Sequence, residues 1–353
     1  MFFANLSVKN KLLLVLLPTS LVMFIGGVFI IYSLLESALK DKNTAKMQSE
    51  INYFNNSIHY HLKLAQEFAT LFSSYDFVND AYTKQNEDSA AIFLQNEIAR
   101  IIKKLPDDAK NYQIHFHKPP AQSFVRSWTK RRGDDLSGFR QTIMEVYKTR
   151  KPITGIELGI GGFAIRGIVP IFNKNNSYLG SVEYFYSPDD LLNLLSKQSQ
   201  NNNSIFITLI KSDLADKLFE KSVLEKSYPT EFNGYYFAKT NVSWLNLNSL
   251  TNQNFVSILD STNTINVFSM HKMTFGILPI YDFNNVKIGY YLFAENNIKE
   301  YEAVNNKMVY FIVGFIIGFT LLIGVFYLFI LKLIIKPILQ ATEKIKKVSE
   351  GIF

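Results

Sequence analysis

The sequence contains no cysteine, and only two of its 353 residues are tryptophan. The lack of cysteine excludes disulfides, thiolate metal sites and cysteine nucleophiles. Charged residues are scarce at 19%, whereas hydrophobic residues make up 48%, which argues against a purely soluble chain. Thirty phenylalanines and nineteen tyrosines supply enough apolar surface for packed cores, so the composition excludes intrinsic disorder.

Two stretches lack ionisable side chains altogether. Residues 12–35 and 308–331 contain no Asp, Glu, Lys, Arg or His, and each run is 24 residues long. A helix of that length reaches about 36 Å, which is enough for a hydrocarbon core of about 30 Å. Both runs are therefore predicted to be transmembrane helices. A cleaved signal peptide is the alternative for the first run, but its apolar stretch is too long and no A-x-A-like site follows it.

The lysines that flank these runs predict their orientation. Two lysines precede the first run and five follow the second: Lys9, Lys11, Lys332, Lys336, Lys344, Lys346 and Lys347. The positive-inside rule then places both termini, residues 1–11 and 332–353, in the cytoplasm, and residues 36–307 outside the inner membrane. Much of the net charge of +7 lies beside the membrane, so nucleic acid is not an expected partner.

Residues 36–307 are predicted to form a long stalk helix and two sheet modules. The stalk, residues 36–105, carries an apolar stripe that packs on its own domain or on a dimer mate: Phe54, Ile58, His61, Ala65, Phe68 and Phe72. From residue 112 the pattern changes to two strands, a helix and three further strands. This order suits a PAS-like antiparallel sheet with helices on one face.

An internal repeat indicates that this architecture is duplicated. Pro170 and Gly180 flank a polar turn, and Pro279 and Gly289 flank a similar turn 109 residues later. Both pairs fit the hairpin that joins the last two strands of such a sheet. The fold class is thus α+β, with a distal module (residues 106–190) and a proximal module (residues 191–300).

Several segments of the distal module form a recognisable set: residues 115–117, 123–128, 133–140, 155–157, 162, 166–170 and 180–183. With these segments the module resembles the double-Cache sensor domains of bacterial methyl-accepting chemotaxis proteins, which also occur in some histidine kinases and diguanylate cyclases. The resemblance is specific over about residues 110–190 and only architectural over 191–300.

Pro337 follows the second apolar run, and the apolar residues after it are spaced like the a/d seam of a parallel coiled coil: Ile338, Ala341, Ile345, Val348 and Ile352. With this pattern the C-terminal tail resembles the start of a HAMP linker. The sequence stops at residue 353, before a HAMP connector or second helix. We expect either a fragment or a truncated receptor, and the seam and the stalk stripe predict a homodimer.

Three arginines in the distal module, Arg126, Arg140 and Arg166, are candidates for binding a ligand carboxylate, because a guanidinium fork makes two parallel charge-assisted bonds. Arg126 and Trp128 are similar to the Arg-x-Trp pair of amino-acid-binding double-Cache domains. In those domains the arginine takes the carboxylate and aromatic residues wall the pocket. The alternative is that the arginines pair with nearby carboxylates and fix loops. The candidate partners are Asp134, Asp135 and Glu157.

Glu157 and Glu183 could hold a ligand ammonium group or pair with the arginines. His115 and His117 project to one face of a strand and could ligate a metal. With no third ligand evident nearby, no metal site is predicted, and the histidines are expected in a pocket wall or a core. The chain has no catalytic motif, so we expect neither enzymatic activity nor a cofactor.

These features predict a chemoreceptor in the bacterial inner membrane that binds a small, carboxylate-bearing metabolite in the periplasm. It would signal through its second membrane helix to the cytoplasmic chemotaxis kinase and adaptor, by way of a signalling module absent from this sequence. Two alternatives remain open. One is the sensor part of a histidine kinase or diguanylate cyclase whose catalytic part follows residue 353, and the other is a membrane-held binding module without signalling output.

Overall fold

The computed structural model describes residues 8–105, 113–160, 162–188, 192, 204–219, 221–238 and 253–349. The chain divides into two compact units, which we call the sheet unit (Asn43–Asn297) and the helix unit (Met1–Lys42 together with Ile298–Phe353). The predicted module boundaries after residues 105 and 190, and the last residues of the predicted HAMP start, 350–353, fall outside the described residues.

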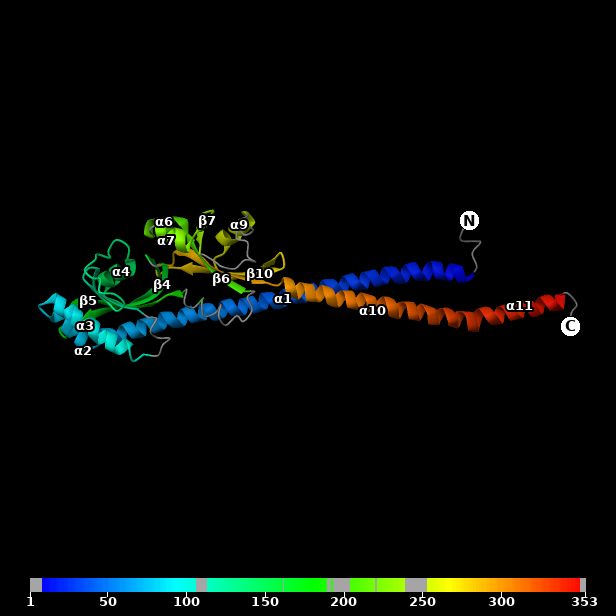
Figure 1. Ribbon diagram of the computed structural model, residues 1–353, viewed down its shortest axis with the longest axis horizontal. Coiled ribbons are helices and arrows are strands. Elements are labelled where there is room, and N and C mark those ends of the chain that lie inside the picture. Colours follow the sequence, from blue (N-terminus) through cyan, green and yellow to red (C-terminus); the bar gives the residue numbers. More distant parts are fainter. Residues whose placement is uncertain are drawn as a thin grey trace. The chain divides into compact units, whose positions relative to one another are not determined.

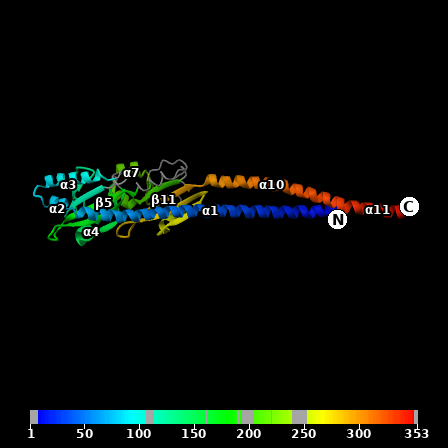
Figure 2. The ribbon, with the colours of Figure 1, turned by 90° about the horizontal axis from the view of Figure 1, so that it is seen from below.

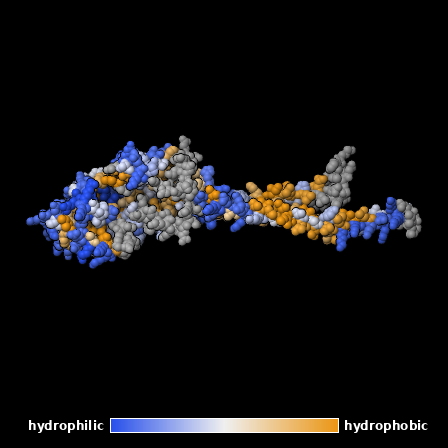
Figure 3. Space-filling view, viewed as in Figure 1, coloured by the Kyte–Doolittle hydropathy of each residue, from blue (hydrophilic) through white to orange (hydrophobic). Residues whose placement is uncertain are grey.

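The helix unit holds the two apolar runs. It comprises the first part of α1 (Val8–Ser73), α10 (Ile298–Ile330), a π-helical turn η2 (Leu331–Ile335) and α11 (Lys336–Ser349). Two helices of the described chain, α1 and α10, are long and apolar enough to cross a membrane. Figure 3 shows apolar side chains gathered along them and hydrophilic side chains along α11. Phe24 and Phe315 stack with their ring centroids 4.0 Å apart.

The predicted stalk helix, residues 36–105, is wrong as a single element. Helix α1 ends at Ser73, and α2 (Asp76–Thr83) and α3 (Glu87–Ile102) follow. At the break the hydroxyls of Ser73 and Ser74 donate back to main-chain carbonyls, and the next residue, Tyr75, has an extended backbone.

The distal module is a five-stranded antiparallel sheet in the order β2-β1-β5-β4-β3. The predicted succession of two strands, a helix and three strands is confirmed. The elements are β1 (Gln113–Lys118), β2 (Gln122–Arg126), α4 (Gln141–Thr149), β3 (Ile153–Gly159), β4 (Gly162–Phe172) and β5 (Tyr178–Tyr186).

Helices cover both faces of the distal sheet, and not one face as predicted (Figure 1). Gly167 on β4 lies against the backbone of α1 at Ala65. The next residue, Ile168, points to the opposite face and packs with Ile143 and Val146 of α4. The stripe predicted on residues 54–72 does pack on its own domain, since Phe54, Ala65 and Phe72 belong to the same core cluster as the sheet. Figure 2 shows α1 running in front of both sheets.

The proximal module is a six-stranded antiparallel sheet in the order β7-β8-β6-β11-β10-β9. It too has α1 against one face, through Met47 and Ile51, and α9 against the other, through Phe255 and Leu259. The elements are β6 (Ser204–Lys211), α6 (Ser212–Leu218), α7 (Lys221–Ser227), β7 (Thr230–Phe232), β8 (Tyr235–Phe237), α9 (Gln253–Ser261), β9 (Asn266–Met270), β10 (Met273–Tyr281) and β11 (Lys287–Asn296).

The repeat predicted from the Pro and Gly spacing is confirmed in the hairpins β4–β5 and β10–β11. Gly180 pairs with Ile171 and Gly289 pairs with Ile280, and the strand register shifts after each of these isoleucines. A Cβ on Gly180 would lie 2.1 Å from the His117 carbonyl oxygen, and one on Gly289 would lie 2.1 Å from the Leu209 carbonyl oxygen. Both copies therefore need glycine because a neighbouring backbone approaches too closely for any side chain.

The two modules meet where the β10–β11 turn reaches the edge strand β3 of the distal sheet. The main-chain N–H of Phe283 donates to the carbonyl of Ile156 at 3.2 Å. A Cβ on Gly155 would lie 2.4 Å from Cβ of Phe283, so glycine lets the turn approach. The turn thus extends the hydrogen bonding of an otherwise open sheet edge.

Candidate ligand-binding site

Most of the charged residues predicted for the site lie on one face of the distal sheet. His115 on β1 and Ile168 on β4 both lie opposite Glu183 on β5. Arg166 lies two residues before Ile168 on β4. Arg166 pairs with Gly155 on β3, and Glu157 lies two residues after Gly155. Because residues two apart in a strand point to the same side, these side chains share the face that α4 covers.

Arg140, Arg166, Glu157 and Glu183 form a buried ion-pair cluster. Nε of Arg140 donates to Glu157 Oε2 at 2.8 Å, and Nη2 of Arg140 donates to Glu183 Oε1 at 2.6 Å. Arg166 donates to the same Glu183 oxygen and lies 3.4 Å from Glu157 Oε2. None of the four residues is more than 6% exposed. Two positive and two negative charges therefore balance one another away from water.

The electrostatics of this cluster favour the charged forms of Glu183 and Arg140, whereas burial and the neighbouring Arg140 lower the pKa of Arg166. Burial alone would raise the pKa of the Glu183 carboxyl, but Arg140 and Arg166 outweigh burial and hold this pKa well below its usual range. Burial would lower the pKa of Arg140, but the two glutamates outweigh it and raise this pKa. Glu183 is therefore an ionised carboxylate at neutral pH, although its side chain has no exposure to solvent.

The start of α4 holds Glu157 in place. The main-chain N–H of Thr142 donates to Glu157 Oε1 at 3.0 Å, and the Thr142 hydroxyl donates to Oε2 at 2.8 Å. These donors belong to the first turn of a helix, whose N–H groups have no partner within the helix and favour a negative charge. Arg140 immediately precedes α4, so one short segment supplies both a cation and anion-binding donors to the cluster.

His115 and His117 on β1 complete the polar face, and both are at most 2% exposed. Nε2 of His115 lies 2.8 Å from the Ser123 hydroxyl, and Nδ1 of His117 lies 3.0 Å from the Ser181 hydroxyl. Burial lowers the pKa of His115 to about 4, and burial together with the neighbouring His115 lowers the pKa of His117 well below its ordinary value. Both imidazoles are thus neutral at pH 7.

Arg126 stands at the end of β2 and holds a bidentate ion pair with Asp134. Nη1 and Nη2 of the guanidinium donate to the two carboxylate oxygens at 2.9 and 2.6 Å. The Arg126 hydrogen bonds lower the pKa of Asp134. The Arg126 side chain is 10% exposed and that of Asp134 is 25% exposed. Arg126 is thus the candidate arginine whose carboxylate partner has direct access to solvent.

Trp128 borders the cluster from the solvent side. Its ring packs edge-on against His115, with centroids 5.6 Å apart, and against Phe185 at 5.3 Å. The residue nevertheless keeps 44% of its surface exposed. Its role as a pocket wall next to Arg126 remains a prediction.

Not all of the candidate residues meet in the cluster. Asp135 lies apart from it on an exposed turn, where its carboxylate accepts the N–H of Ser137 at 2.9 Å. Arg126 and Asp134 lie beside the cluster and pair with one another. The residues brought together on the buried face are His115, His117, Arg140, Glu157, Arg166 and Glu183.

Three hydroxyl residues and one glutamine in the site gave no signal of their own in the sequence. Thr142 fixes Glu157, while Ser123 and Ser181 hold the two histidines. Gln95 on α3 donates to the carbonyls of Arg126 and Thr129, both at 2.9 Å. Strand alternation places Ser181 on the same face as Glu183, which is the one available signal, but the pairing of β1 with β5 is needed to see what Ser181 touches.

The residues predicted for signal transmission lie on α11. Pro337 lies just after the π-helical turn η2, which joins α10 to α11 without a break, so its missing N–H removes a bond inside a continuous helix. Ile338 and Ile345 are 59% and 70% exposed, and Ala341 is also exposed. The side chain of Val348 and residue 352 are outside the described part of the chain. An exposed apolar seam is what a second copy of the helix would cover, and the seam remains a prediction.

Comparison with known proteins identifies the sheet unit. The family model dCache_3, described as the double sensory domain of two-component sensor kinases, matches residues 43–297. No curated protein matches the chain. The family-level resemblance to double-Cache sensor domains is thereby confirmed, and the more specific assignments to a chemotaxis receptor and a HAMP linker remain predictions.

Three solved structures illustrate what the chain is similar to. The extracellular domain of a protein assigned as a histidine kinase, vpHK1S-Z8, is 16% identical, with a TM-score of 0.46 over 76% of this chain and 98% of that one. The sensor domain of the Vibrio cholerae histidine kinase DctB is 10% identical, with a TM-score of 0.40 over 72% and 96%.

The third is the ligand-binding domain of the Campylobacter jejuni chemoreceptor Tlp3 in complex with 4-methylisoleucine. It is 12% identical, with a TM-score of 0.40 over 72% of this chain and 90% of that one. All three TM-scores are below 0.5, so the family assignment rests on the sequence match alone. By that match, which spans both modules from residue 43 to residue 297, this chain belongs to the family of double sensory domains of two-component sensor kinases.

Proposed function

We propose that this protein is a transmembrane receptor of the bacterial inner membrane. Its sheet unit lies in the periplasm, binds a small carboxylate-bearing metabolite in the distal module, and passes a conformational signal inward. One observation carries this proposal: a sensory domain at residues 43–297 is flanked along the chain by two helices long and apolar enough to span a bilayer. The flanking lysines favour cytoplasmic termini.

Arg126 is the proposed contact for the ligand carboxylate. Its guanidinium already binds a carboxylate in bidentate geometry, because Asp134 occupies both Nη atoms. Asp134 is partly exposed and belongs to the same loop as Lys130 and Arg131, so a ligand carboxylate can exchange with it at little desolvation cost. The buried glutamates Glu157 and Glu183, by contrast, are held by arginines on both sides. Exchange at Arg126 would free the loop to close over the ligand next to Trp128.

The signal route that we propose runs through the contact between the modules. Glu157 lies on β3, and the neighbouring Ile156 accepts a hydrogen bond from the β10–β11 turn at Phe283. Strand β11 ends beside α1, where Glu295 pairs with Lys46, and the chain then enters α10. Rearrangement of the distal face therefore has a covalent and hydrogen-bonded path to the second membrane helix. The expected output is a slide or rotation of about 1–2 Å.

Ligand binding must favour one receptor state over the other if it is to shift the output. The seam on α11 would receive the motion in a homodimer, because a coiled coil has discrete packing arrangements. Residues 332–353 are thus proposed as the start of a HAMP linker. Nucleic acid and catalysis have no place in this scheme.

Two outputs are proposed side by side. A chemoreceptor would act on the cytoplasmic chemotaxis kinase and adaptor, and the similarity of residues 110–190 to that group favours it. A histidine kinase or diguanylate cyclase would carry its own catalytic domain, and the description of the matched family favours a sensor kinase.

A chimera of residues 1–353 with a known chemoreceptor signalling part tests the chemoreceptor output. Ligand-dependent swimming or kinase activity would support it, and a ligand that binds without any output would count against it.

Arg126→Ala is predicted to weaken ligand binding. A thermal-shift screen of the detergent-solubilised chain against organic acids, amino acids and amines should find a compound that raises Tm. Loss of a charge-assisted bidentate contact worth about 1.5–3 kcal/mol should raise the Kd of that compound by about 10–100-fold. Isothermal titration measures the change.

Arg131→Ala is the matched control for this prediction. Arg131 is in the same loop, but its side chain is 77% exposed and lies 3.9 Å from Asp134, so its removal should leave the Kd unchanged. Equal affinities of the wild-type chain and Arg126→Ala for the compound would refute the assignment of the carboxylate contact.

A further inference from the structure

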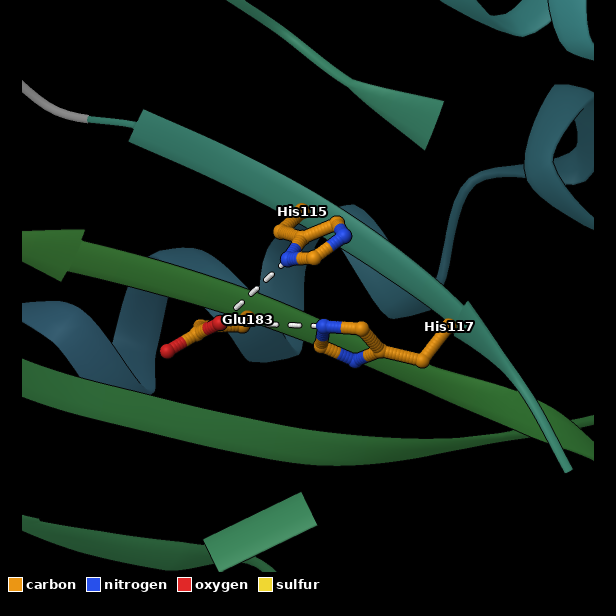
Figure 4. Close-up of side chains that lie close together, drawn as sticks. All are labelled: His115, His117 and Glu183. Atoms are coloured by element: carbon orange, nitrogen blue, oxygen red, sulfur yellow. Dashed lines mark ion pairs between the residues drawn. The ribbon is translucent and has the colours of Figure 1, made fainter. Parts of the chain in front are cut away.

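Three buried side chains on the polar face of the distal sheet converge on one point. His115 and His117 project from β1 toward Glu183 on β5 (Figure 4). Each residue offers one donor atom, and the three atoms all lie within 4.8 Å of one another. The sequence suggested the two histidines as metal ligands but offered no third ligand, since Glu183 is more than sixty residues away along the chain. The pairing of β1 with β5 supplies it.

The separations of the donor atoms fit a shared ion better than direct hydrogen bonds. Nδ1 of His115 lies 3.8 Å from Glu183 Oε2, and Nε2 of His117 lies 3.7 Å from the same oxygen. These distances are too long for hydrogen bonds. Two ligands bound at about 2.1 Å to one tetrahedral metal ion are about 3.4 Å apart. The two gaps to Glu183 are about 0.3–0.4 Å longer, so a small closing movement of the side chains would complete the coordination.

Two of the facing atoms have no hydrogen-bond partner in the described part of the chain. Nε2 of His117 and Oε2 of Glu183 are buried and make no hydrogen bond, and their residues are 1% and 0% exposed. A buried polar atom without a partner costs about 1–3 kcal/mol, and more when it is charged. A metal ion bound between these two atoms would supply the missing interaction of both and remove this cost.

The surrounding groups orient the donors as they do around metal sites. The second ring nitrogen of each histidine is held by a hydroxyl, Ser123 for His115 and Ser181 for His117. Arg140 and Arg166 both bind Oε1 of Glu183, which leaves Oε2 to face the histidines. Such outer contacts fix the ring orientation and the tautomer of a ligating histidine.

We propose that His115, His117 and Glu183 form a binding site for a divalent transition-metal ion such as Zn²⁺. Two imidazoles and one carboxylate are a common zinc ligand set, and three protein ligands leave a coordination position for water or for a carboxylate oxygen of a bound molecule. The positive charges of the two nearby arginines repel a divalent cation. Binding therefore depends on the bonds to the two imidazole nitrogens, which suit transition metals. The site thus excludes Ca²⁺ and Mg²⁺, which require more oxygen ligands.

The test uses the full chain in detergent, purified with a tag that contains no histidine and stripped with a chelator. Titration with Co²⁺ should give one ion per chain and the visible absorption bands of a four- or five-coordinate centre, and Zn²⁺ should displace the Co²⁺. Ca²⁺ should not displace it. These readouts need no substitution and do not depend on any organic ligand, so a failure here leaves the proposed receptor function untouched.

His115→Gln and His117→Gln each remove one donor while keeping a polar side chain that can bond the neighbouring serine. Because even outer-contact residues change metal affinity by about 10–100-fold, loss of a direct ligand should weaken Co²⁺ binding by at least about 100-fold. His59→Gln is the matched control, since His59 is an exposed histidine on α1, and it should bind Co²⁺ like the wild type. A wild-type chain that takes up no Co²⁺, or glutamine variants that bind it as tightly as the wild type, would overturn the proposal.

Discussion

Glu183→Gln should destabilise the sheet unit by about 3–5 kcal/mol, the usual cost of removing one partner from a buried ion pair. The substitution keeps the size of the side chain but removes the negative charge that both Arg140 and Arg166 contact. Glu157 would then be the one carboxylate left to balance two buried guanidinium groups. Denaturant titration of the detergent-solubilised chain, followed by near-ultraviolet circular dichroism, measures the loss.

The same chemical change at an exposed pair is the control. Glu67 pairs with Lys63 one helical turn away on α1, and its side chain is 59% exposed, so Glu67→Gln should cost no more than about 0.5 kcal/mol. Adding Arg166→Gln to Glu183→Gln should recover part of the lost stability, because it restores the balance of charge. A Glu183→Gln variant whose free energy of unfolding lies within about 1 kcal/mol of the wild-type value would contradict the ion-pair account. A loss that small is typical of an exposed ion pair and not of a buried one.

Gly167→Ala should also be severely destabilising, by about 3 kcal/mol or more, because it overpacks a backbone contact. A Cβ on Gly167 would lie 2.3 Å from the carbonyl carbon of Ala65 and 2.3 Å from the main-chain nitrogen of Gln66. Neither atom can rotate away as a side chain can, so β4 and α1 must separate. The core cluster that spans the sheet and α1 would then open. A thermal melt of the full chain should show a lower Tm.

Gly138→Ala is the matched control for Gly167→Ala. No heavy atom would lie within 4 Å of its new Cβ, so the variant should melt like the wild type. If Gly167→Ala also melts at the wild-type temperature, the close contact between α1 and β4 would be contradicted. The core that both modules share with α1 would then be contradicted as well.

Much of the fold follows from local patterns. The strand succession of the distal module is visible as alternation, and the turn chemistry of the two final hairpins is visible as repeated Pro and Gly spacing. Asn176 and Asn285 adopt positive φ in these turns, and Asn173 and Asp282 each accept two main-chain N–H groups there. Turn residues act within a few positions of themselves, so the sequence is sufficient to predict them.

The site depends on pairings that no local pattern encodes. Strand β1 pairs with β5, far away along the chain, and this pairing alone sets His115 opposite Glu183. Likewise, the sequence presents Glu157 and Glu183 as candidate partners for arginines, but the choice of partner depends on the sheet order and on where α4 begins. Helix α4 starts at Gln141, and Arg140 before it keeps a non-helical backbone. That start lets Thr142 reach Glu157.

The break in the stalk, by contrast, lies at residues whose side chains act locally. The periodic stripe along residues 54–72 continues without interruption in the sequence, and the next helical pattern begins soon after residue 87. The hydroxyls of Ser73 and Ser74 bond to carbonyls three residues back, and Asn86 caps α3 by accepting the N–H of Ser89 at 3.0 Å. Capping residues of this kind mark helix ends in a sequence.

The absence of cysteine makes it possible to test on which side of the membrane each part lies with two single substitutions. Lys130→Cys places a thiol on an exposed loop of the distal module, and Ser349→Cys places one at the exposed end of α11. In intact spheroplasts a membrane-impermeant maleimide should label Lys130→Cys fully, and should label Ser349→Cys only after the membrane is permeabilised. Labelling of Ser349→Cys from outside, with Lys130→Cys protected, would contradict a receptor whose sensory domain faces the periplasm.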